Sequence, residues 1–240
     1  MKRPLSFTVT GVHLVFFTSL ILLGLVSEAH AVIYDLKSQW SETQNPNGVW
    51  SYMAGDSYLP GCSNWSDSYG TQFAWVAGTD WSGHVPAWFQ AKTNYWWTSV
   101  GDIVCHTTAP YSTYQGSARA VWTSPVDSQI VIDGSVWLAR PTNPPRSTYW
   151  YLDLNGSQVS SGYLYYDGNL YDDLLDGSGG ASALSTYVHV GDTVALRLVR
   201  GGNGLEDYVG VNFTIETIPE PATVTIMLLG ATLCVIKRKR

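Results

Sequence analysis

The sequence predicts an all-β fold, and three observations support this prediction. Glycine, proline, asparagine and aspartate form turn signals about every ten residues through the middle of the chain. Short alternating or apolar runs lie between these turns. No long stretch carries apolar residues at the helical spacing i, i+3, i+4 without interruption by glycine, proline or β-branched residues. This rhythm is typical of a β-sandwich or barrel.

Several segments carry the strand signal clearly. Alternating or apolar residues bounded by turns predict strands at 118–123, 129–138, 149–154, 158–166, 193–200 and 208–215. Asp133-Gly134 lies inside the second of these and indicates a hairpin or a bulge. Asn155-Gly156, between the third and the fourth, indicates a hairpin. A glycine-rich turn at 201–204 precedes the last strand.

The C-terminus has three parts in a fixed order. Pro219, Glu220 and Pro221 come first, and an apolar run over 222–236 follows. The chain ends with four cations: Lys237, Arg238, Lys239 and Arg240. As a helix the apolar run would be roughly 22 Å long, short for a hydrocarbon core of about 30 Å, but long basic side chains can reach past its end. The basic end is expected on the cytoplasmic side.

This arrangement resembles the PEP-CTERM sorting signal of Gram-negative bacteria. The resemblance implies that an exosortase in the inner membrane recognises the tail and cuts it near the Pro-Glu-Pro. The mature protein would then pass to the cell surface or to an extracellular polysaccharide matrix. The alternative is an ordinary C-terminal membrane anchor.

The N-terminus has the pattern of a signal peptide. Met1-Lys2-Arg3 is basic, residues 7–26 are largely apolar, and Ala29-His30-Ala31 supplies the small residues Ala29 and Ala31 of a signal peptidase site. A signal anchor is the alternative. The sequence thus predicts a signal peptide at 1–31, a β-sandwich domain at 32–217 and a sorting signal with a short transmembrane helix at 218–240.

The expected mature domain is acidic. It contains seven Lys and Arg residues against 17 Asp and Glu residues, a net charge of −10. Nucleic-acid binding needs clustered cations, so this balance argues against it, and also against anionic lipid surfaces. An acidic surface suits a soluble exported protein.

Two cysteines remain in the domain once the tail is set aside. In an oxidising compartment, Cys62 and Cys105 are expected to form one disulfide. Two unrelated free thiols are the alternative. A zinc site is not expected, because Cys105-His106 lacks companion ligands.

All 11 tryptophans lie between Trp40 and Trp150. Some of them can serve as core residues, because an indole buries a large area. Others can face solvent as flat platforms on which sugar rings stack. Trp81, Trp96 and Trp97 are the first candidates for platforms, since each sits among small polar residues in a turn-rich stretch. Trp122 and Trp137 lie in apolar strand runs and are expected in the core.

A second resemblance covers most of the domain. The segment from Asn45 to Tyr52 resembles the N-P-x-G-x-W-x-Y opening of a group of secreted bacterial jelly-roll domains. Residues 118–125, 130–134 and 191–194 are similar to later elements of that group. The resemblance implies a jelly-roll-like β-sandwich of the carbohydrate-binding-module or lectin type. Thr107 follows His106 where the group usually has proline, so no role is carried over to His106. Trp50 and Tyr52 are expected in the core.

Acidic loops are candidates for a structural Ca²⁺ ion, which prefers oxygen ligands. The first set follows a sandwich-fold analogy and is Asp35, Glu206 and Asp207. The second set is Asp167, Asn169, Asp172, Asp173 and Asp176, whose spacing does not match an EF-hand. Solvated loops are the alternative for both sets.

Signatures of catalysis are missing from the sequence. It contains no G-x-S-x-G elbow, H-E-x-x-H segment or phosphate loop. A carboxylate pair for glycoside hydrolysis remains open among many aspartates. The sequence therefore favours a non-catalytic carbohydrate-binding module. The alternative is a structural or adhesion protein of the extracellular matrix with no defined small ligand.

Overall fold

The structure is a computed structural model that describes residues 31–67, 69–78, 85–108, 117–140, 146–201 and 207–218. The two targeting segments lie outside these residues, apart from Ala31. Within the described ranges, no helix has the length and apolar character needed to cross a bilayer. Residues 32–218 form one compact unit.

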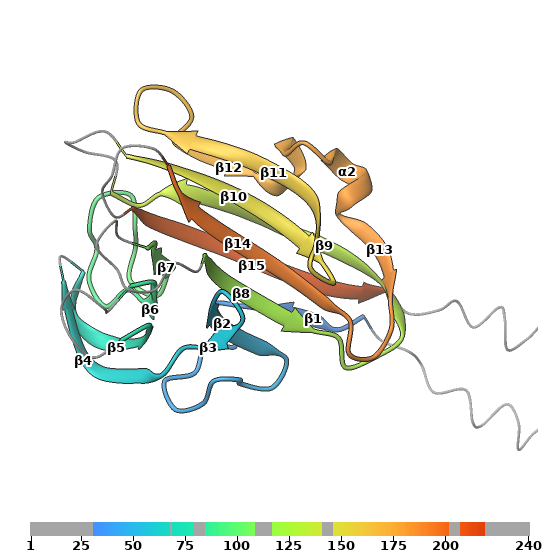
Figure 1. The fold of residues 1–240 in the computed structure, drawn as a ribbon, viewed down its shortest axis with the longest axis horizontal. Helices are drawn as coiled ribbons and strands as arrows, with labels where there is room; N and C mark the ends of the chain where they lie inside the picture. Colours follow the sequence, from blue (N-terminus) through green and yellow to red (C-terminus); the bar gives the residue numbers. More distant parts are fainter. Residues whose placement is uncertain are drawn as a thin grey trace, which may run out of the picture. The chain divides into compact units, whose positions relative to one another are not determined.

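The domain is nearly all-β, as predicted, and consists of two antiparallel sheets (Figure 1). The first sheet has the order β12-β9-β15-β7-β6-β5-β4, with β1 paired to β15 and β13 paired to β9. Its strands are β1 (Ile33–Asp35), β4 (Gly61–Asp67), β5 (Gly70–Val76), β6 (Ala87–Gln90), β7 (Ile103–His106), β9 (Ser128–Leu138), β12 (Tyr171–Asp173), β13 (Ser185–Val188) and β15 (Tyr208–Ile218).

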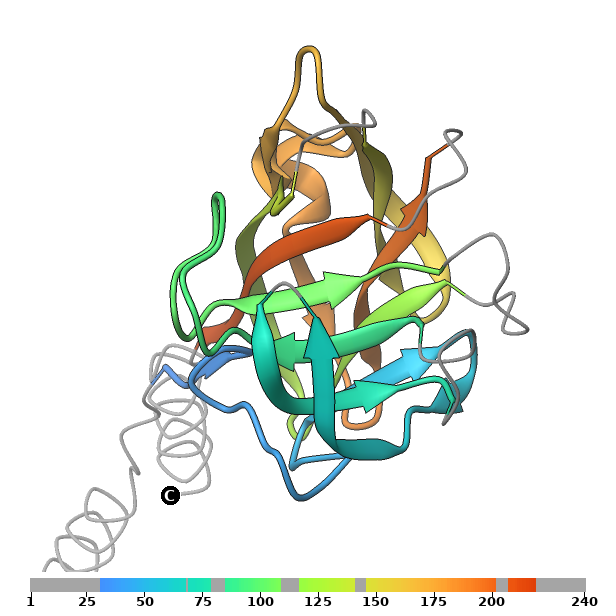
Figure 2. The same ribbon diagram turned by 90° about the vertical axis from the view of Figure 1, so that its left-hand side faces the viewer.

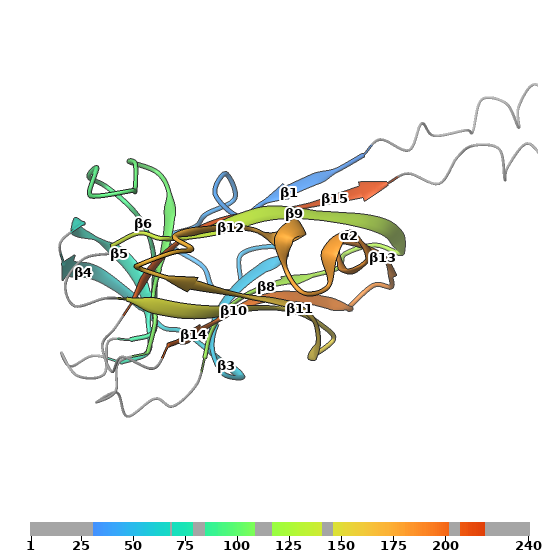
Figure 3. The same ribbon diagram turned by 90° about the horizontal axis from the view of Figure 1, so that it is seen from above.

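The second sheet has the order β11-β10-β14-β8-β2-β3. Its strands are β2 (Trp50–Ala54), β3 (Ser57–Tyr58), β8 (Ala118–Thr123), β10 (Ser147–Leu154), β11 (Ser157–Tyr165) and β14 (Thr193–Arg200). A 3₁₀ turn, η1 (Leu174–Asp176), and one short helix, α2 (Gly180–Ala183), connect β12 to β13. Figure 3 shows the two sheets as layers, one above the other.

The two glycine turn signals have different outcomes. Asn155 and Gly156 join β10 to β11 with φ angles of 49° and 78°, as expected for a tight hairpin. Asp133 and Gly134 form no hairpin, because β9 runs straight through them. A Cβ atom at Gly134 would overlap the backbone of Asn212 on β15, so the glycine permits close approach of the two strands.

Large aromatic residues fill the space between the sheets. Trp50, Tyr52 and Trp122 are fully buried there, which confirms the core prediction for all three. Trp88 from the first sheet and Trp150 from the second are equally buried. Complete burial of side chains this large is a dominant source of stability for the sandwich.

A second apolar cluster lies on the outer face of the first sheet. It includes Trp65, Tyr69, Phe89, Val104 and Tyr208, which come from β4, β6, β7, β15 and the turn after β4. Figure 2 views the molecule toward the end that carries β4, β5 and β6. Part of this sheet is therefore apolar on both faces, in contrast to a sheet with one solvated side.

The structure contradicts the predicted disulfide between Cys62 and Cys105, since both thiols are free. Cys62 is on β4 and Cys105 on β7, with β5 and β6 between them. Three strand spacings of about 4.8 Å place the two residues about 14 Å apart, well beyond the reach of a disulfide. They also face opposite sides of the sheet, because Cys105 belongs to the inner core and Cys62 packs against the outer cluster.

The two thiols should differ in reactivity. Cys62 is half-buried, whereas Cys105 is fully buried and burial raises the pKa of its thiol well above the usual value. Alkylation of the native full chain with iodoacetamide should label Cys62 and spare Cys105, and denaturant should expose both. Mass spectrometry before and after denaturation measures this. A loss of 2 Da in denaturant with label on neither Cys62 nor Cys105, read from the peptides so that Cys234 is kept apart, would support the disulfide instead.

Candidate functional site

An aromatic row crosses the outer face of the first sheet. Tyr171 on β12 lies directly opposite Trp137 on β9, and Trp137 lies opposite Gly210 on β15. Residues opposite one another on antiparallel strands project to the same face. The row continues to Val104 on β7, which belongs to the outer cluster. The two aromatic rings are therefore placed side by side, anchored on the apolar cluster.

Trp137 is half-buried and packs against the outer cluster, so it does not lie in the inner core as its apolar neighbours suggested. The reason is strand alternation: Val136 and Leu138 point inward, and the residue between them points outward. The Trp137 indole lies across Gly210, where any Cβ atom would overlap the ring. Glycine at this position lets a large ring lie close to the sheet.

The segment 91–102 brings two more tryptophans to this end of the sheet. Ala91 N–H donates to Asp102 O (2.9 Å), and Tyr95 and Thr98 exchange two backbone hydrogen bonds of 3.1 and 3.0 Å. Trp96 and Trp97 therefore form the two-residue tip of a tight hairpin. Their side chains are 54% and 63% exposed.

The tip holds Trp96 at a φ of 52°. Glycine usually occupies such a position, and a bulky residue there costs on the order of 1–3 kcal/mol. Bulky residues in this conformation cluster at functional sites, where the surrounding structure enforces them. The strained conformation of the tip therefore makes Trp96 and Trp97 candidates for a functional site.

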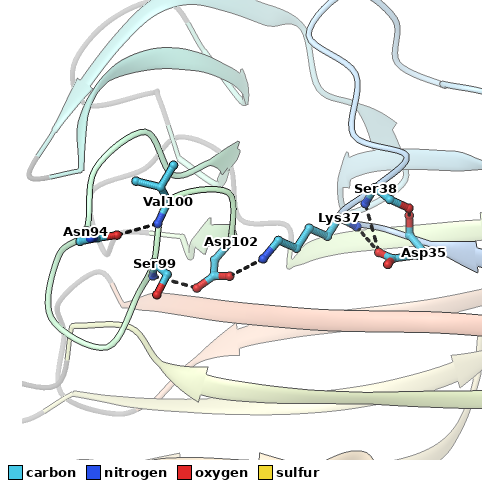
Figure 4. Close-up of polar contacts among 7 residues, drawn as sticks. All are labelled: Asp35, Lys37, Ser38, Asn94, Ser99, Val100 and Asp102. Carbon is cyan, nitrogen blue, oxygen red and sulfur yellow. Dashed lines mark hydrogen bonds and ion pairs between the residues drawn. The ribbon is translucent and has the colours of Figure 1, made fainter.

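Polar contacts hold this hairpin in place (Figure 4). Asn94 Oδ1 accepts from Val100 N–H (2.8 Å), and Asp102 Oδ2 accepts from Ser99 N–H (2.8 Å). The other oxygen of Asp102 pairs with Lys37 Nζ at 2.8 Å, which ties the hairpin to the turn after β1. These contacts fix the geometry of an exposed loop.

Trp97, Trp137 and Tyr171 meet at a pocket of about 440 Å³. Leu138 and Leu170 complete its lining. Tyr171 is 57% exposed, so two of the three rings are open to solvent. A mostly apolar pocket of this size, bordered by aromatic rings, suits a ligand that stacks its own flat apolar face on them.

Exposed tyrosines on the second sheet are arranged differently, in a stacked row. Tyr149 and Tyr163 stack with ring centroids 4.4 Å apart and an interplanar angle of 29°, and Tyr165 stacks on Tyr163 at 5.5 Å. The guanidinium of Arg197 lies 4.1 Å from the centre of the neighbouring Tyr151 ring. Each of these rings therefore has at least one face against another ring or a cation.

The predicted platform residues have mixed outcomes. The structure brings Trp97 to the pocket and leaves Trp96 exposed beside it. Trp81 lies outside the described residues. Sequence reasoning missed Trp137 and Tyr171 as pocket residues. Strict alternation along 129–138 was a signal for Trp137, but its pairing with Tyr171 depends on strand register, which the sequence does not show.

The structure does not assemble the first predicted calcium set. Asp35 lies opposite Thr214 on β15, seven residues or roughly 23 Å along the strand from Asp207. Asp207 is fully buried, and its carboxylate accepts a hydrogen bond from the Thr148 hydroxyl (3.3 Å). Glu206 lies outside the described residues. Burial raises the pKa of Asp207 to about 7, only partly opposed by the charge of Arg146.

Two carboxylates of the second set, those of Asp172 and Asp173, accept hydrogen bonds within the chain. Asp172 accepts from the Trp150 indole (2.7 Å) and from Asn169 (2.6 Å), while Asp173 caps η1 through Leu175 N–H (2.9 Å). Within the described residues, the carboxylates of Asp167 and Asp176 make no such contact. In the part of the chain that the structure describes, no three metal-binding side chains cluster.

Asp67, beside the outer cluster, has a carboxyl group with a raised pKa. Burial raises its pKa to about 6, and hydrogen bonds from Tyr69 N–H (2.7 Å) and Gln72 (3.2 Å), with the charge of Arg140, lower it only in part. The outer cluster also buries His106, whose ring lies 4.2 Å from that of Tyr208 in an edge-on contact. The polar groups at this end are thus packed beneath the surface.

Comparison with protein-family models and with curated proteins finds no match. Among solved structures, the chain is similar to CBM51 from Clostridium perfringens GH95, solved with methyl-galactose, at 12% identity, a TM-score of 0.39 and coverage of 77% of this chain and 99% of that one. It is also similar to a family 35 carbohydrate binding module from Clostridium thermocellum, at 10% identity, a TM-score of 0.30 and coverage of 78% of this chain and 98% of that one. A third similar structure is a cyclase from Fischerella sp. TAU, at 10% identity, a TM-score of 0.34 and coverage of 80% of this chain and 100% of that one. Scores this low carry no argument about function.

The raised pKa of Asp67 predicts a pH-dependent stability. The folded state holds this proton more tightly than the unfolded state, so the free energy of unfolding should fall as pH rises from about 4 to 6. Asp67→Asn removes this loss, and the variant should be about 1–3 kcal/mol more stable than the unchanged chain at pH 8. At pH 3.5 the two should be equal. Denaturant unfolding at several pH values measures the difference, and a constant difference across the range would contradict the prediction.

Proposed function

We propose that residues 32–217 form a non-catalytic carbohydrate-binding module of jelly-roll type, and that sugar binds in the pocket of Trp97, Trp137 and Tyr171. The observation that carries the proposal is the convergence of three rings from three separate segments on one open pocket. Two of these rings are more than half exposed in a domain whose other described tryptophans, apart from Trp96, are buried or half-buried.

The chemistry of the pocket matches that of a sugar ring. A pyranose presents C–H groups on one face and hydroxyls around its edge. An indole or phenol ring stacks against the C–H face and leaves the hydroxyls free to meet polar neighbours. The pocket is mostly apolar and its rings are held by sheet register and by a fixed hairpin, so little ordering is needed on binding.

The proposal includes export. The N-terminal segment is cut by signal peptidase, and the PEP-CTERM-like tail is recognised and removed by an exosortase. The protein then reaches the cell surface or the extracellular polysaccharide matrix of a Gram-negative bacterium. The acidic charge of the domain and the sorting-signal resemblance support this placement. An extracellular polysaccharide is thus the partner proposed for the pocket.

Substitution of the pocket rings tests the function. Tyr171→Ala and Trp97→Ala should each weaken binding to an array-identified glycan at least about tenfold, because aromatic anchors dominate binding energy. Both side chains are exposed, so the free energy of unfolding should stay within about 0.5 kcal/mol. Glycan-array binding and calorimetry of the full chain give the readout.

Tyr58→Ala is the matched control. Tyr58 is 58% exposed, close to the 57% of Tyr171, and lies on β3 of the other sheet. The control should bind as the unchanged chain does. Equal binding by all three variants would overturn the pocket as the binding site, and no glycan binding at all would favour the structural or adhesion protein over the binding module.

The tail has its own test. Replacement of Pro219, Glu220 and Pro221 by alanine should leave an unprocessed precursor in the inner membrane, because the exosortase no longer recognises it. Cell fractionation and the mass of the chain report the outcome. Replacement of Thr223 and Thr225 by alanine, inside the apolar run, is the control and should not block processing. Normal release of the triple-alanine chain would remove the sorting proposal.

A further inference from the structure

The outer face of the first sheet continues from the aromatic row as a polar strip. Asn212 on β15 and Asp133 on β9 lie two and four residues along their strands from Gly210 and Trp137. Residues two apart on a strand share a face, so both project on the same side as Trp137. Thr214, opposite Asp133, belongs to the same strip. The distance from Trp137 to Asp133 is roughly 13 Å along the strand.

The polar side chains of this strip are available to a ligand. Asn212 and Asp133 are exposed, and Thr214 is partly exposed. Within the described residues the side-chain amide of Asn212 and the carboxylate of Asp133 make no hydrogen bond; the Thr214 hydroxyl donates to the backbone carbonyl of Asp133 at 3.4 Å. An amide and a carboxylate together offer donors and acceptors for sugar hydroxyls.

The strip has one sign of charge. Asp133 lies on it, Asp173 projects beside Tyr171 on β12, and Glu216 is exposed further along β15. The nearby cation Lys37 is already paired with Asp102 at 2.8 Å. A ligand that carries carboxylates or sulfates would meet uncompensated negative charge here.

We propose that the site takes a linear, uncharged polysaccharide, with one sugar in the aromatic pocket and the following sugars over Asn212 and Asp133. This inference rests on the proposed function of the pocket and adds the direction, the length and the charge class of the ligand. The strip runs along β9 and β15 on the same face as Trp137, so an internal segment of a long chain can lie along it. An acidic polysaccharide is disfavoured by the carboxylates.

The test uses chain length and charge. Calorimetry of the full chain is run with cello-, manno- and chito-oligosaccharides of one, two and four residues, and with tetragalacturonate as the anionic counterpart. At least one neutral tetrasaccharide should bind roughly tenfold or more tightly than its monosaccharide, because several added hydrogen bonds contribute. Tetragalacturonate should bind more weakly than that neutral tetrasaccharide.

Two strip variants locate the effect. Asn212→Ala and Asp133→Ala should each lower tetrasaccharide affinity by about 3- to 10-fold, as expected for the loss of one or two hydrogen bonds, and leave monosaccharide affinity unchanged. Gln158→Ala is the matched control, an exposed amide on β11 of the second sheet, and should bind normally. Far-ultraviolet circular dichroism checks that each variant is folded.

The outcomes separate this inference from the proposed function. Binding that depends on Trp97 and Tyr171 but not on chain length, Asn212 or Asp133 would overturn the strip and keep the pocket. Tighter binding of tetragalacturonate than of every neutral tetrasaccharide would overturn the charge class. No binding of any of these sugars by the unchanged chain would overturn the inference, and a negative glycan array as well would overturn the proposed function.

Discussion

The pairing of β9 with β15 is the interaction on which the other features depend. These two 11-residue strands share ten directly opposed residue pairs, from Val209 opposite Leu138 to Ile218 opposite Gln129. Their inward residues, such as Val136 and Phe213, supply the sandwich core. Their outward residues supply the pocket floor and the polar strip. A shift of one residue would exchange these two faces, so the register that stabilises the core also positions Trp137 over Gly210.

Local signals in the sequence predicted local structure well. The Asn155-Gly156 hairpin and the alternating strands were readable, because turn geometry and period-two burial act on neighbouring residues. Asp133-Gly134 misled for a physical reason: its glycine serves a neighbouring strand that follows about 80 residues later, not a turn. The disulfide prediction was wrong for a similar reason, because it too depended on residues distant in the sequence. Cysteine counting carries no information on sheet order, and the order β7-β6-β5-β4 separates Cys62 from Cys105.

The candidate site was predictable only in part. Composition and local polarity pointed to Trp96 and Trp97, which are indeed exposed. Exposure alone does not define the pocket: the exposed tyrosines of β10 and β11 stack on one another, whereas Trp97 and Tyr171 border a pocket. The surroundings of each ring depend on the residue opposite it on the neighbouring strand. Trp137 faces a glycine and Tyr171 faces Trp137, whereas Tyr149 faces another tyrosine, and register decides each of these.

The hairpin at 91–102 combines a strained tip with a firmly held base. The left-handed conformation of Trp96 opposes folding, and each exposed ion pair at the base, Lys37 with Asp102 and Lys92 with Glu42, stabilises by only about 0–1 kcal/mol. Backbone and side-chain hydrogen bonds must therefore supply most of what offsets the strain. A loop of relaxed conformation would have no such strain to offset. The chain instead maintains a local conformation that keeps Trp97 over the pocket, which is the arrangement expected when the position of an exposed ring matters more than local stability.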